Sequence, residues 1–282
     1  MNMIDYSTPS YNKFGVDQRV QQVELDMLKH IHSFCQENGL TYYIAWGTFL
    51  GAMRHGGFIP WDDDVDIVMP REDYMKLISL SGKLDEKYHL ACTETTPDYQ
   101  FSFAKLEYRY SRLVEKNYPE GRHGGVYIDI FPLDPITSNP LLQRLQIWTN
   151  VIWKIKSHSL HRFYDTNTKL NWFWKAAGAL MRLKYGNDSH SFHVKWEKKH
   201  SHPVNDSEWV AEFFDADMNG VMRRELYGKG RLYTFEDAKF VGPEKADEYL
   251  THAYGDWRKL PPEEKRRAFH GFDVEFSDIR LF

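Results

Sequence analysis

The sequence predicts an α/β (α+β) protein in which helices flank a mixed sheet. Helical and extended patterns alternate along residues 16–136, and mixed patterns return after residue 205. The 282 residues can bury a sizeable core, and no internal repeat or low-complexity linker divides them. We therefore expect a single catalytic domain over residues 1–282, with its core in 16–136 and 205–282. A basic, Trp-rich helical insertion is expected at about 139–204.

The first elements follow from the spacing of apolar residues. Apolar side chains recur at three- and four-residue steps over residues 16–38, which predicts a helix, and Gly39 suits the position after its last turn. Residues 40–46 are rich in β-forming side chains and predict a strand. Residues 48–54 fit a short helix, because the two glycines in 55–57 end the pattern.

The remaining elements are read in the same way. Strands are expected at 64–68, 99–115, 126–132, 233–236 and 238–241, and helices at 70–80, 141–159, 170–184 and 244–254.

Composition limits the cellular context and the kind of partner. The two cysteines, Cys35 and Cys92, lie in apolar surroundings far from any CxxC pattern, which favours a reducing compartment and opposes a zinc site. Residues 1–20 are polar and lack the apolar core of a signal peptide, and no run of eighteen apolar residues predicts a membrane span. We expect a cytoplasmic protein with no nucleic-acid partner.

The most informative segment is residues 61–66, which hold four carboxylates in six positions: Asp62, Asp63, Asp64 and Asp66. Such crowding of like charge is costly unless a cation or several hydrogen-bond donors offset it. Acidic and apolar residues alternate from residue 64 onward, so Asp64 and Asp66 would share one face of the predicted strand. Two carboxylates on one face provide a site for a divalent metal ion.

Three other interpretations of this acidic run are open. A calcium-binding loop needs glycine at its sixth position, where this chain has Ile67. The run could also be a solvated acidic turn without function. A D-x-D motif of a glycosyltransferase, which binds a nucleotide sugar through a metal ion, is the strongest of the three.

Two further features stand on either side of the acidic run. Gly47-Thr48 lies at a predicted turn into a helix, where backbone N–H groups and the helix dipole suit a phosphate group; the Thr48 hydroxyl could instead cap the helix. Asp129 lies in the centre of a later predicted strand. It could act as a third metal ligand, or it could hydrogen-bond to a turn, and Asp134 competes for the ligand role.

The order of these features resembles the nucleotidyltransferase superfold. That fold has a Gly-Ser turn, a strand with two acids two residues apart, and a third acid on a later strand. Carboxylates from adjacent strands can hold one or two Mg²⁺ ions, which would clamp the attacking and leaving oxygens of a displacement at phosphorus.

Three longer blocks carry a closer resemblance. Residues 42–67 read YYIAWGTFLGAMRHGGFIPWDDDVDI, residues 128–134 read IDIFPLD, and residues 250–266 contain LTHAYGDW and LPPEEKR. These blocks resemble the LicD family of cholinephosphotransferases, whose core is shared with the fukutin-related proteins. The resemblance covers residues 20–135 and 230–270 and leaves out the basic insertion.

The resemblance implies a nucleotidyltransferase-like fold and a metal-dependent reaction. LicD-type enzymes transfer phosphocholine, or a similar substituted phosphate, from a CDP-activated donor to a sugar hydroxyl, and release CMP; CDP-choline is the favoured donor here. The acceptor would be a glycan or lipid-linked glycan, as in the modification of teichoic acid, lipopolysaccharide or capsule. Asp64, Asp66 and Asp129 would bind Mg²⁺, with Mn²⁺ as the alternative. The proton of the acceptor hydroxyl would go to Asp62, Asp63 or Asp129.

The phosphates of the donor also require cationic partners. Arg54 and His55 lie between Gly47-Thr48 and the acidic run, and Lys105 lies on a strand between the two acidic blocks. With Gly47 and Thr48, these residues form the predicted donor-binding set. Arg54 could instead be a surface charge on a short helix, and His55 could serve only its Gly-Gly turn.

The insertion has an unusual charge for this chain. Residues 139–200 hold eleven Lys and Arg but three acidic residues, whereas the whole chain has a formal net charge of −4. Basic and aromatic residues together suit peripheral contact with an anionic membrane, here the inner face of the plasma membrane. An ordinary helical subdomain with lysines spread over a Trp-rich core is the alternative.

Two other functions compete with the phosphotransferase. The first is a nucleotide-sugar-dependent glycosyltransferase that uses the Asp64 and Asp66 metal site. The second is a glycan-binding protein that retains the fold without catalysis, which the complete set of acidic residues opposes.

Overall fold

The computed structural model describes residues 6, 8–96, 99, 101–115, 122–145, 176, 179, 180, 183, 207–212, 220–268 and 272–277. Most of the predicted insertion, including the helices expected at 141–159 and 170–184 beyond residue 145, therefore lies outside the described residues, and its boundaries and membrane contact stay predictions. Among the described residues, no helix combines the length and the hydropathy needed to cross a bilayer.

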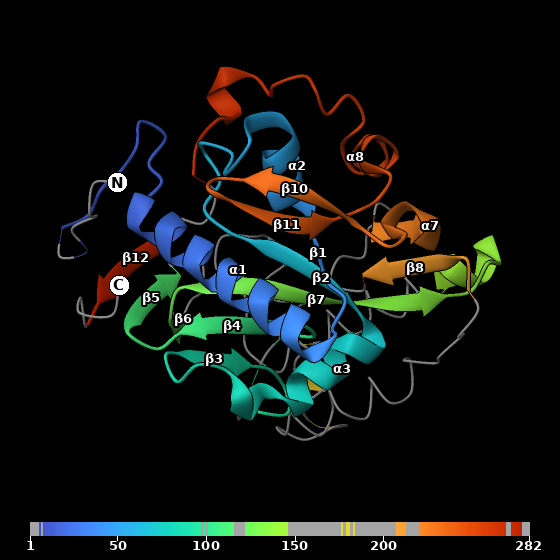
Figure 1. Cartoon of the computed structure of the whole chain (residues 1–282), viewed down its shortest axis with the longest axis horizontal. Helices are drawn as coiled ribbons and strands as arrows, with labels where there is room; N and C mark the ends of the chain where they lie inside the picture. The colour runs from blue at the N-terminus through green and yellow to red at the C-terminus, as the bar shows by residue number, and fades with distance from the viewer. Residues whose placement is uncertain are drawn as a thin grey trace.

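A curled mixed sheet forms the centre of the described chain, which confirms the predicted α/β class (Figure 1). Its strands follow the order β1 (Tyr43–Ile44), β2 (Asp66–Pro70), β7 (Tyr127–Ile136), β4 (Ala104–Tyr108) and β3 (Tyr88–Ala91). The β2–β7 pair is parallel, and the other pairs of this row are antiparallel. β8 (Trp209–Glu212) pairs with the second half of β7, and β9 (Val221–Arg223) pairs with β8.

Helix α1 (Gln18–Asn38) covers one face of the sheet (Figure 1). Its apolar side chains, among them Val20, Leu28 and Ile31, are buried against the sheet, as the periodicity predicts. Gly39 follows the helix with a φ of 61°, in the left-handed conformation that glycine adopts without strain. Helix α3 (Arg71–Ser79) begins directly after β2, and the 3₁₀ turn η1 (Ser81–Lys83) follows it.

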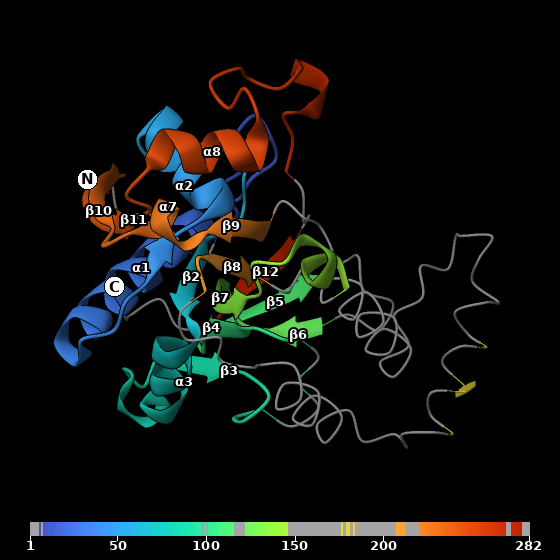
Figure 2. The ribbon, with the colours of Figure 1, turned by 90° about the vertical axis from the view of Figure 1, so that its right-hand side faces the viewer.

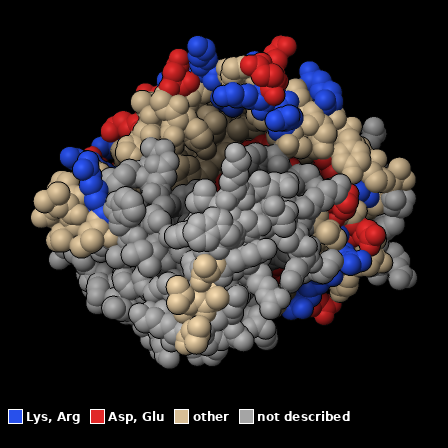
Figure 3. All heavy atoms as spheres, turned by 180° about the vertical axis from the view of Figure 1, so that it is seen from behind, with Lys and Arg blue, Asp and Glu red and all other residues tan. Residues whose placement is uncertain are grey.

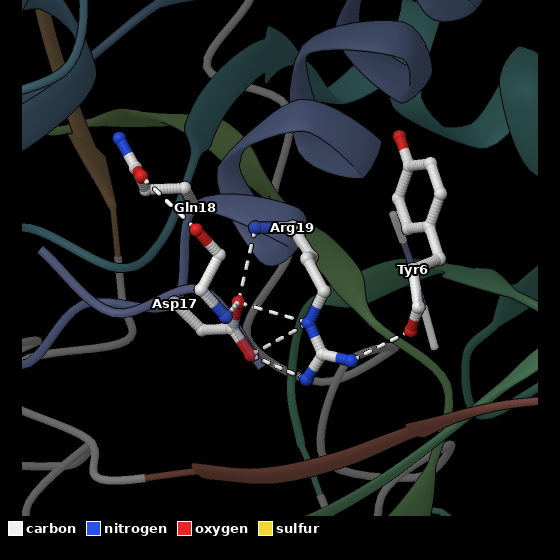
Figure 4. A network of polar contacts seen from close by, with 5 residues as sticks. Tyr6, Asp17, Gln18 and Arg19 are labelled. Carbon is white, nitrogen blue, oxygen red and sulfur yellow. Dashed lines mark hydrogen bonds and ion pairs between the residues drawn. The ribbon is translucent and has the colours of Figure 1, made fainter. Parts of the chain in front are cut away.

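The start of α1 is anchored by a buried ion pair (Figure 4). The guanidinium of Arg19 donates from Nη2 to Asp17 Oδ2 at 2.6 Å and from Nη1 to the carbonyl of Tyr6 at 2.7 Å. The Tyr6 ring contacts Phe276 of β12 (Phe272–Phe276) at a centroid distance of 5.3 Å. β12 pairs with β5 (Ser111–Glu115), which pairs with β6 (Arg122–Gly124), so this contact joins the first described residues to a second sheet.

A second layer lies over the β1 edge of the sheet (Figures 1 and 2). It consists of α2 (Trp46–His55), the hairpin β10 (Arg231–Phe235) and β11 (Ala238–Gly242), α7 (Arg224–Tyr227), α8 (Ala246–Tyr254) and the 3₁₀ turn η3 (Glu263–Lys265). Phe49 of α2 packs edge-on against Tyr233 and Tyr249, with centroid distances of 5.0 and 5.5 Å. This packing places the C-terminal segment beside the segment that precedes the acidic run.

Several element boundaries differ from the sequence predictions. β1 spans two residues instead of seven, because the chain turns at Trp46 into α2, which begins two residues earlier than expected. The predicted strand at 64–68 becomes a strand that starts at Asp66. The short strands β3, β6, β8, β9 and β12 were not predicted, and each depends on a partner strand rather than on a long pattern of its own.

Candidate active site

Three charged side chains form a row across three neighbouring strands. Asp66 of β2 is the register partner of Asp129 of β7, and Asp129 is the register partner of Lys105 of β4. Register partners project from the same face of a sheet, so all three side chains lie on one face. Lys105 Nζ lies 2.5 Å from Asp129 Oδ1. The fold thus brings together Asp66 and Asp129, which are 63 positions apart in the chain.

Lys105 is held inside the protein by this pair and by aromatic rings. Its side chain is 3% exposed, and Nζ lies 3.3 Å from the ring centroid of Tyr127 and 5.2 Å from that of Phe101. Aromatic faces attract a desolvated ammonium group, and the Asp129 carboxylate neutralises it. Lys105, which the sequence predicts to bind donor phosphate, is therefore primarily the ion-pair partner of Asp129.

The acidic run approaches this row as an extended segment before β2. The backbone N–H of Asp129 donates to the carbonyl of Val65 at 2.8 Å, so residues 64–66 continue alongside β7. The hydroxyl of Thr48 accepts from the backbone N–H of Asp66 at 2.8 Å. Thr48 is buried and does not cap its helix, since Ala45 is the N-cap residue of α2. Its hydroxyl instead fixes the start of the strand that carries Asp66.

Asp62 occupies the space above the first turn of α2. A Cβ atom on Gly47 would lie 2.5 Å from Asp62 Oδ2, so only glycine permits this approach. The Asp62 carbonyl accepts from Gln21 Nε2 of α1 at 2.9 Å, which holds the loop from the other side. The helix start predicted to bind phosphate therefore has a carboxylate beside it, where the positive end of the helix dipole favours negative charge. Asp63, next in the loop, is buried.

Negative charge is concentrated around Asp66. Burial raises the pKa of the Asp66 carboxyl well above its usual range, and the carboxylates of Asp64 and Asp129 raise it further. The pKa of Glu24 on α1 is also raised well above its usual range by burial, and next by Asp64 and Asp63. An arrangement that disfavours deprotonated carboxyls in this way is stabilised when a cation binds.

β8 brings a further carboxylate to the site. Glu212 Oε2 accepts from the indole Nε1 of Trp46 at 2.5 Å, and Glu212 also contributes to the raised pKa of Asp66. Trp46 has a φ of 44°, a conformation that is uncommon for residues other than glycine, and its N–H donates to the Tyr249 hydroxyl at 3.4 Å. Glu212 and Tyr249 thus support a strained residue next to Gly47.

The predicted cations Arg54 and His55 lie at the end of α2. Arg54 donates from Nη1 to the carbonyl of Trp257 at 3.1 Å, and burial lowers the pKa of its guanidinium, while Asp62 opposes that shift. His55 is exposed and meets the edge of the Trp61 ring at a centroid distance of 5.8 Å. The charge of Asp62 in the acidic loop therefore acts on Arg54. His55 lies on the exposed side, against Trp61.

Asp134 is not available as a metal ligand in place of Asp129, because it pairs with Arg71. Arg71 donates to it twice, from Nε to Oδ1 at 2.7 Å and from Nη2 to Oδ2 at 2.6 Å. A bidentate pair of this kind uses both carboxylate oxygens for the fold. Between the two aspartates of β7, Asp129 is the one placed beside Asp66.

The site offers oxygen ligands suited to Mg²⁺ or Mn²⁺. No three His, Cys, Asp or Glu side chains within the described ranges are arranged to hold a metal ion by themselves. Mg²⁺ is commonly bound through one or two carboxylates together with substrate phosphates and water, which fits Asp64 and Asp66. The excess of negative charge around Asp66 also fits a divalent cation.

Glu24, Glu212 and Tyr254 were not among the predicted site residues. Glu24 interrupts the apolar stripe of its helix, and this signal was present in the sequence. Glu212 lies on a four-residue strand that gave no signal. Tyr254 is 42% exposed, yet desolvation and the carboxylates of Asp66 and Asp62 raise the pKa of its hydroxyl, so the hydroxyl end lies near the acidic group.

The molecular surface is uneven in its charge. On the face opposite to that of Figure 1, basic and acidic side chains alternate along the upper rim, and the described surface below this rim is hollowed and largely uncharged (Figure 3).

Known proteins resemble this chain in sequence over the part that contains the site. Residues 39–167 match the family described as LicD/FKTN/FKRP, nucleotidyltransferase domain, and this range contains every predicted site residue. The lipopolysaccharide cholinephosphotransferase LicD of Haemophilus influenzae is 26% identical over 262 residues, which are 89% of this chain and 94% of that protein. An uncharacterised protein of Rickettsia prowazekii is 27% identical over 50% of this chain and 60% of its own length. The human ribitol 5-phosphate transferase FKRP is 37% identical over 54 residues, 19% of this chain and 11% of that protein. The chain is therefore similar to the LicD/FKTN/FKRP nucleotidyltransferase domain over residues 39–167 and to a LicD cholinephosphotransferase over most of its length.

Proposed function

We propose that this chain is a metal-dependent phosphotransferase of the LicD type and transfers phosphocholine, or a closely similar substituted phosphate, from CDP-choline to a sugar hydroxyl of a surface-glycan precursor. The observation that carries the proposal is the row of Asp66, Asp129 and Lys105 beside the acidic loop, within the range that matches the family. Two relatives support the kind of group transferred, since one is named a cholinephosphotransferase and another a ribitol 5-phosphate transferase.

The reaction is a displacement at phosphorus. The oxygen of the acceptor hydroxyl forms a bond to the phosphorus that carries choline, the bond from this phosphorus to the bridging oxygen breaks, and CMP leaves with that oxygen. The hydroxyl proton passes to a carboxylate of the acidic loop. A divalent cation, when bound, would offset the negative charge of the diphosphate and of the leaving CMP.

Each group of residues then has a distinct task. Asp64 and Asp66 would hold the cation, and Asp129, fixed by Lys105, keeps a charged group beside Asp66. Asp62 is better placed than the buried Asp63 to accept the proton, because its side chain is partly exposed beside Gly47. The charge of Asp62 acts on Arg54, and Arg54 orients the phosphates of the donor.

The direct test is release of CMP from CDP-choline in the presence of Mg²⁺ and an acceptor glycan. We expect the purified protein to release CMP and to label the glycan with phosphocholine. Replacement of Asp66 by Asn should lower kcat by about 10³-fold or more, since it removes a ligand of the cation that would offset the charge of the phosphoryl group in the transition state. Asp85→Asn is the matched control, because Asp85 is exposed and accepts a local bond from the N–H of Lys87. Wild-type turnover by Asp66→Asn would contradict the proposal.

The donor can be identified independently of catalysis. A thermal-shift series with CDP-choline, CDP-ribitol, CDP-glycerol, UDP-sugars and GDP-mannose should show strong stabilisation by the true donor alone. Stabilisation by a CDP-alditol in place of CDP-choline would change the transferred group but keep the reaction. Stabilisation by a UDP-sugar or GDP-mannose would indicate a glycosyltransferase.

A further inference from the structure

Glu24 is a buried carboxyl at an unusual position of α1. It stands four residues after Val20 and four before Leu28, on the stripe of α1 that packs against the sheet. Its side chain is 2% exposed, and Oε2 has no hydrogen-bond partner in the part of the chain that the structure describes. A buried carboxylate oxygen without a partner is costly, so its presence in an apolar stripe requires an explanation.

Its position along the helix points it toward the acidic loop. Gln21 lies one helical turn earlier on the same side of α1, and its amide donates to the carbonyl of Asp62 at 2.9 Å. α1 also packs against β7 and β4, the strands that carry Asp129 and Lys105. Glu24 is therefore next to the loop on the helix side, while Asp64 and Asp66 approach from the strand side.

The electrostatic surroundings of Glu24 agree with this placement. After burial, the groups that raise its pKa are carboxylates, with Asp64 first, followed by Asp63, Asp62 and Asp129. Glu24 thus belongs to the same concentration of negative charge as Asp66. A carboxyl that only filled space in the core would gain nothing from such neighbours, and an apolar side chain of similar size would serve better there.

We propose that Glu24 is an additional carboxyl group of the cation site, supplied from α1, which adds its negative charge to that of Asp64 and Asp66. The inference rests on the proposed function in so far as that function requires a divalent cation. It adds a helix to a site that the motif places on strands and loops alone. The expected ligand is a hard divalent cation, Mg²⁺ or Mn²⁺, because the ligands are carboxylate oxygens.

The test measures binding of Mn²⁺ alone by electron paramagnetic resonance, without donor, acceptor or turnover. Glu24→Gln keeps the size and the hydrogen-bonding capacity of a neutral carboxyl and removes the charge. We expect this variant to bind Mn²⁺ at least tenfold more weakly than the wild type, as loss of a ligand or of its support does at other metal sites. Glu37→Gln is the matched control, because Glu37 is an exposed glutamate of the same helix, and it should bind as the wild type does.

A second measurement separates this role from a structural one. Without metal, Glu24→Gln should melt at or above the temperature of the wild type, because no buried charge is lost to a partner. With Mn²⁺, it should gain less in melting temperature than the wild type gains. A purely structural Glu24 predicts the reverse: a lower melting temperature without metal and an equal gain with it.

The outcomes also distinguish this inference from the proposed function. If the wild type binds Mn²⁺ and Glu24→Gln binds it equally well, the role of Glu24 is wrong and the proposed reaction stands. If the wild type binds no Mn²⁺, both the role and the metal dependence of the reaction fail. If Glu24→Gln does not fold, Glu24→Asp serves in its place, since it retracts the carboxyl by one methylene; affinity equal to that of the wild type would then overturn the inference.

Discussion

Asp66 and Asp129 are register partners on adjacent strands, and yet the two halves of the site differ in how their charge is offset. Asp129 forms a buried ion pair with Lys105, which is itself enclosed by aromatic rings. Asp66 is surrounded by carboxylates, of which Asp64 has the largest effect on its pKa. One half is thus neutralised within the fold, and the other half retains an excess of negative charge.

This difference identifies the half of the site in which the proposed cation would bind. Carboxylates placed close together repel one another, which costs stability when no cation is bound. Lys105 removes that cost at one end of the row, so that the excess charge is confined to Asp66 and the acidic loop. The Lys105–Asp129 ion pair therefore fixes one end of the row, and the carboxylates around Asp66 would supply the affinity for the proposed cation.

The largest expected effect follows from breaking the ion pair between Lys105 and Asp129. Lys105→Met leaves the Asp129 carboxylate without its buried partner and should lower the free energy of unfolding by about 3–5 kcal/mol. Urea unfolding followed by circular dichroism measures this change. The matched control is Lys29→Met, which removes a partly exposed ion pair with Asp237 and should cost about 1 kcal/mol or less. Equal losses in the two variants would show that the Lys105 pair has no special role.

The central part of this site could be predicted because local sequence encodes it. The crowded carboxylates of the acidic run indicated a cation site. Asp129, a charged residue within an apolar strand, indicated a second part of the same site. What the pattern could not decide was the choice between Asp129 and Asp134. That choice depends on Arg71, which follows β2 and reaches Asp134 across the sheet.

The site residues that were not predicted show the limit of reading local sequence patterns. Glu24 was present as a break in an apolar stripe, but only the packing of α1 shows that it faces the acidic loop. Glu212 is 146 positions after Asp66, on a strand of four residues that exists because β7 continues far enough to pair with it. Long-range pairing of this kind is set by the tertiary structure and leaves no local period. The same reason explains why β3 and β12 were not predicted.

A smaller effect on the free energy of unfolding should come from Asp66 as pH changes. Because the pKa of Asp66 is raised in the folded protein, its contribution to stability is complete below about pH 4, the range of an unfolded aspartate, and is lost as pH rises toward the folded value. We expect metal-free protein in EDTA to lose stability as pH rises above about 4, by about 1.4 kcal/mol for each unit that separates the two pKa values. Asp66→Asn should flatten this slope in urea unfolding, and Asp85→Asn should leave it unchanged. A slope that is identical in wild type and Asp66→Asn would contradict the assignment.

The smallest expected effect concerns how Asp66 is positioned, since it lacks the side-chain partner that fixes Asp129. Its strand is held at this point by the Thr48 hydroxyl, which accepts from the Asp66 N–H at 2.8 Å. Thr48→Val keeps the shape of the side chain but leaves that buried donor without its acceptor, so we expect a loss of about 1–3 kcal/mol in urea unfolding. Thr48→Ser keeps the hydroxyl and should lose less, although it removes a methyl group. Because the bond acts on β2 and not on the Lys105 pair, Thr48→Val should also weaken Mn²⁺ binding more than Thr48→Ser does. If Thr48→Val keeps the stability of the wild type and Thr48→Ser loses it, packing of the methyl group and not the hydrogen bond holds Asp66 in place.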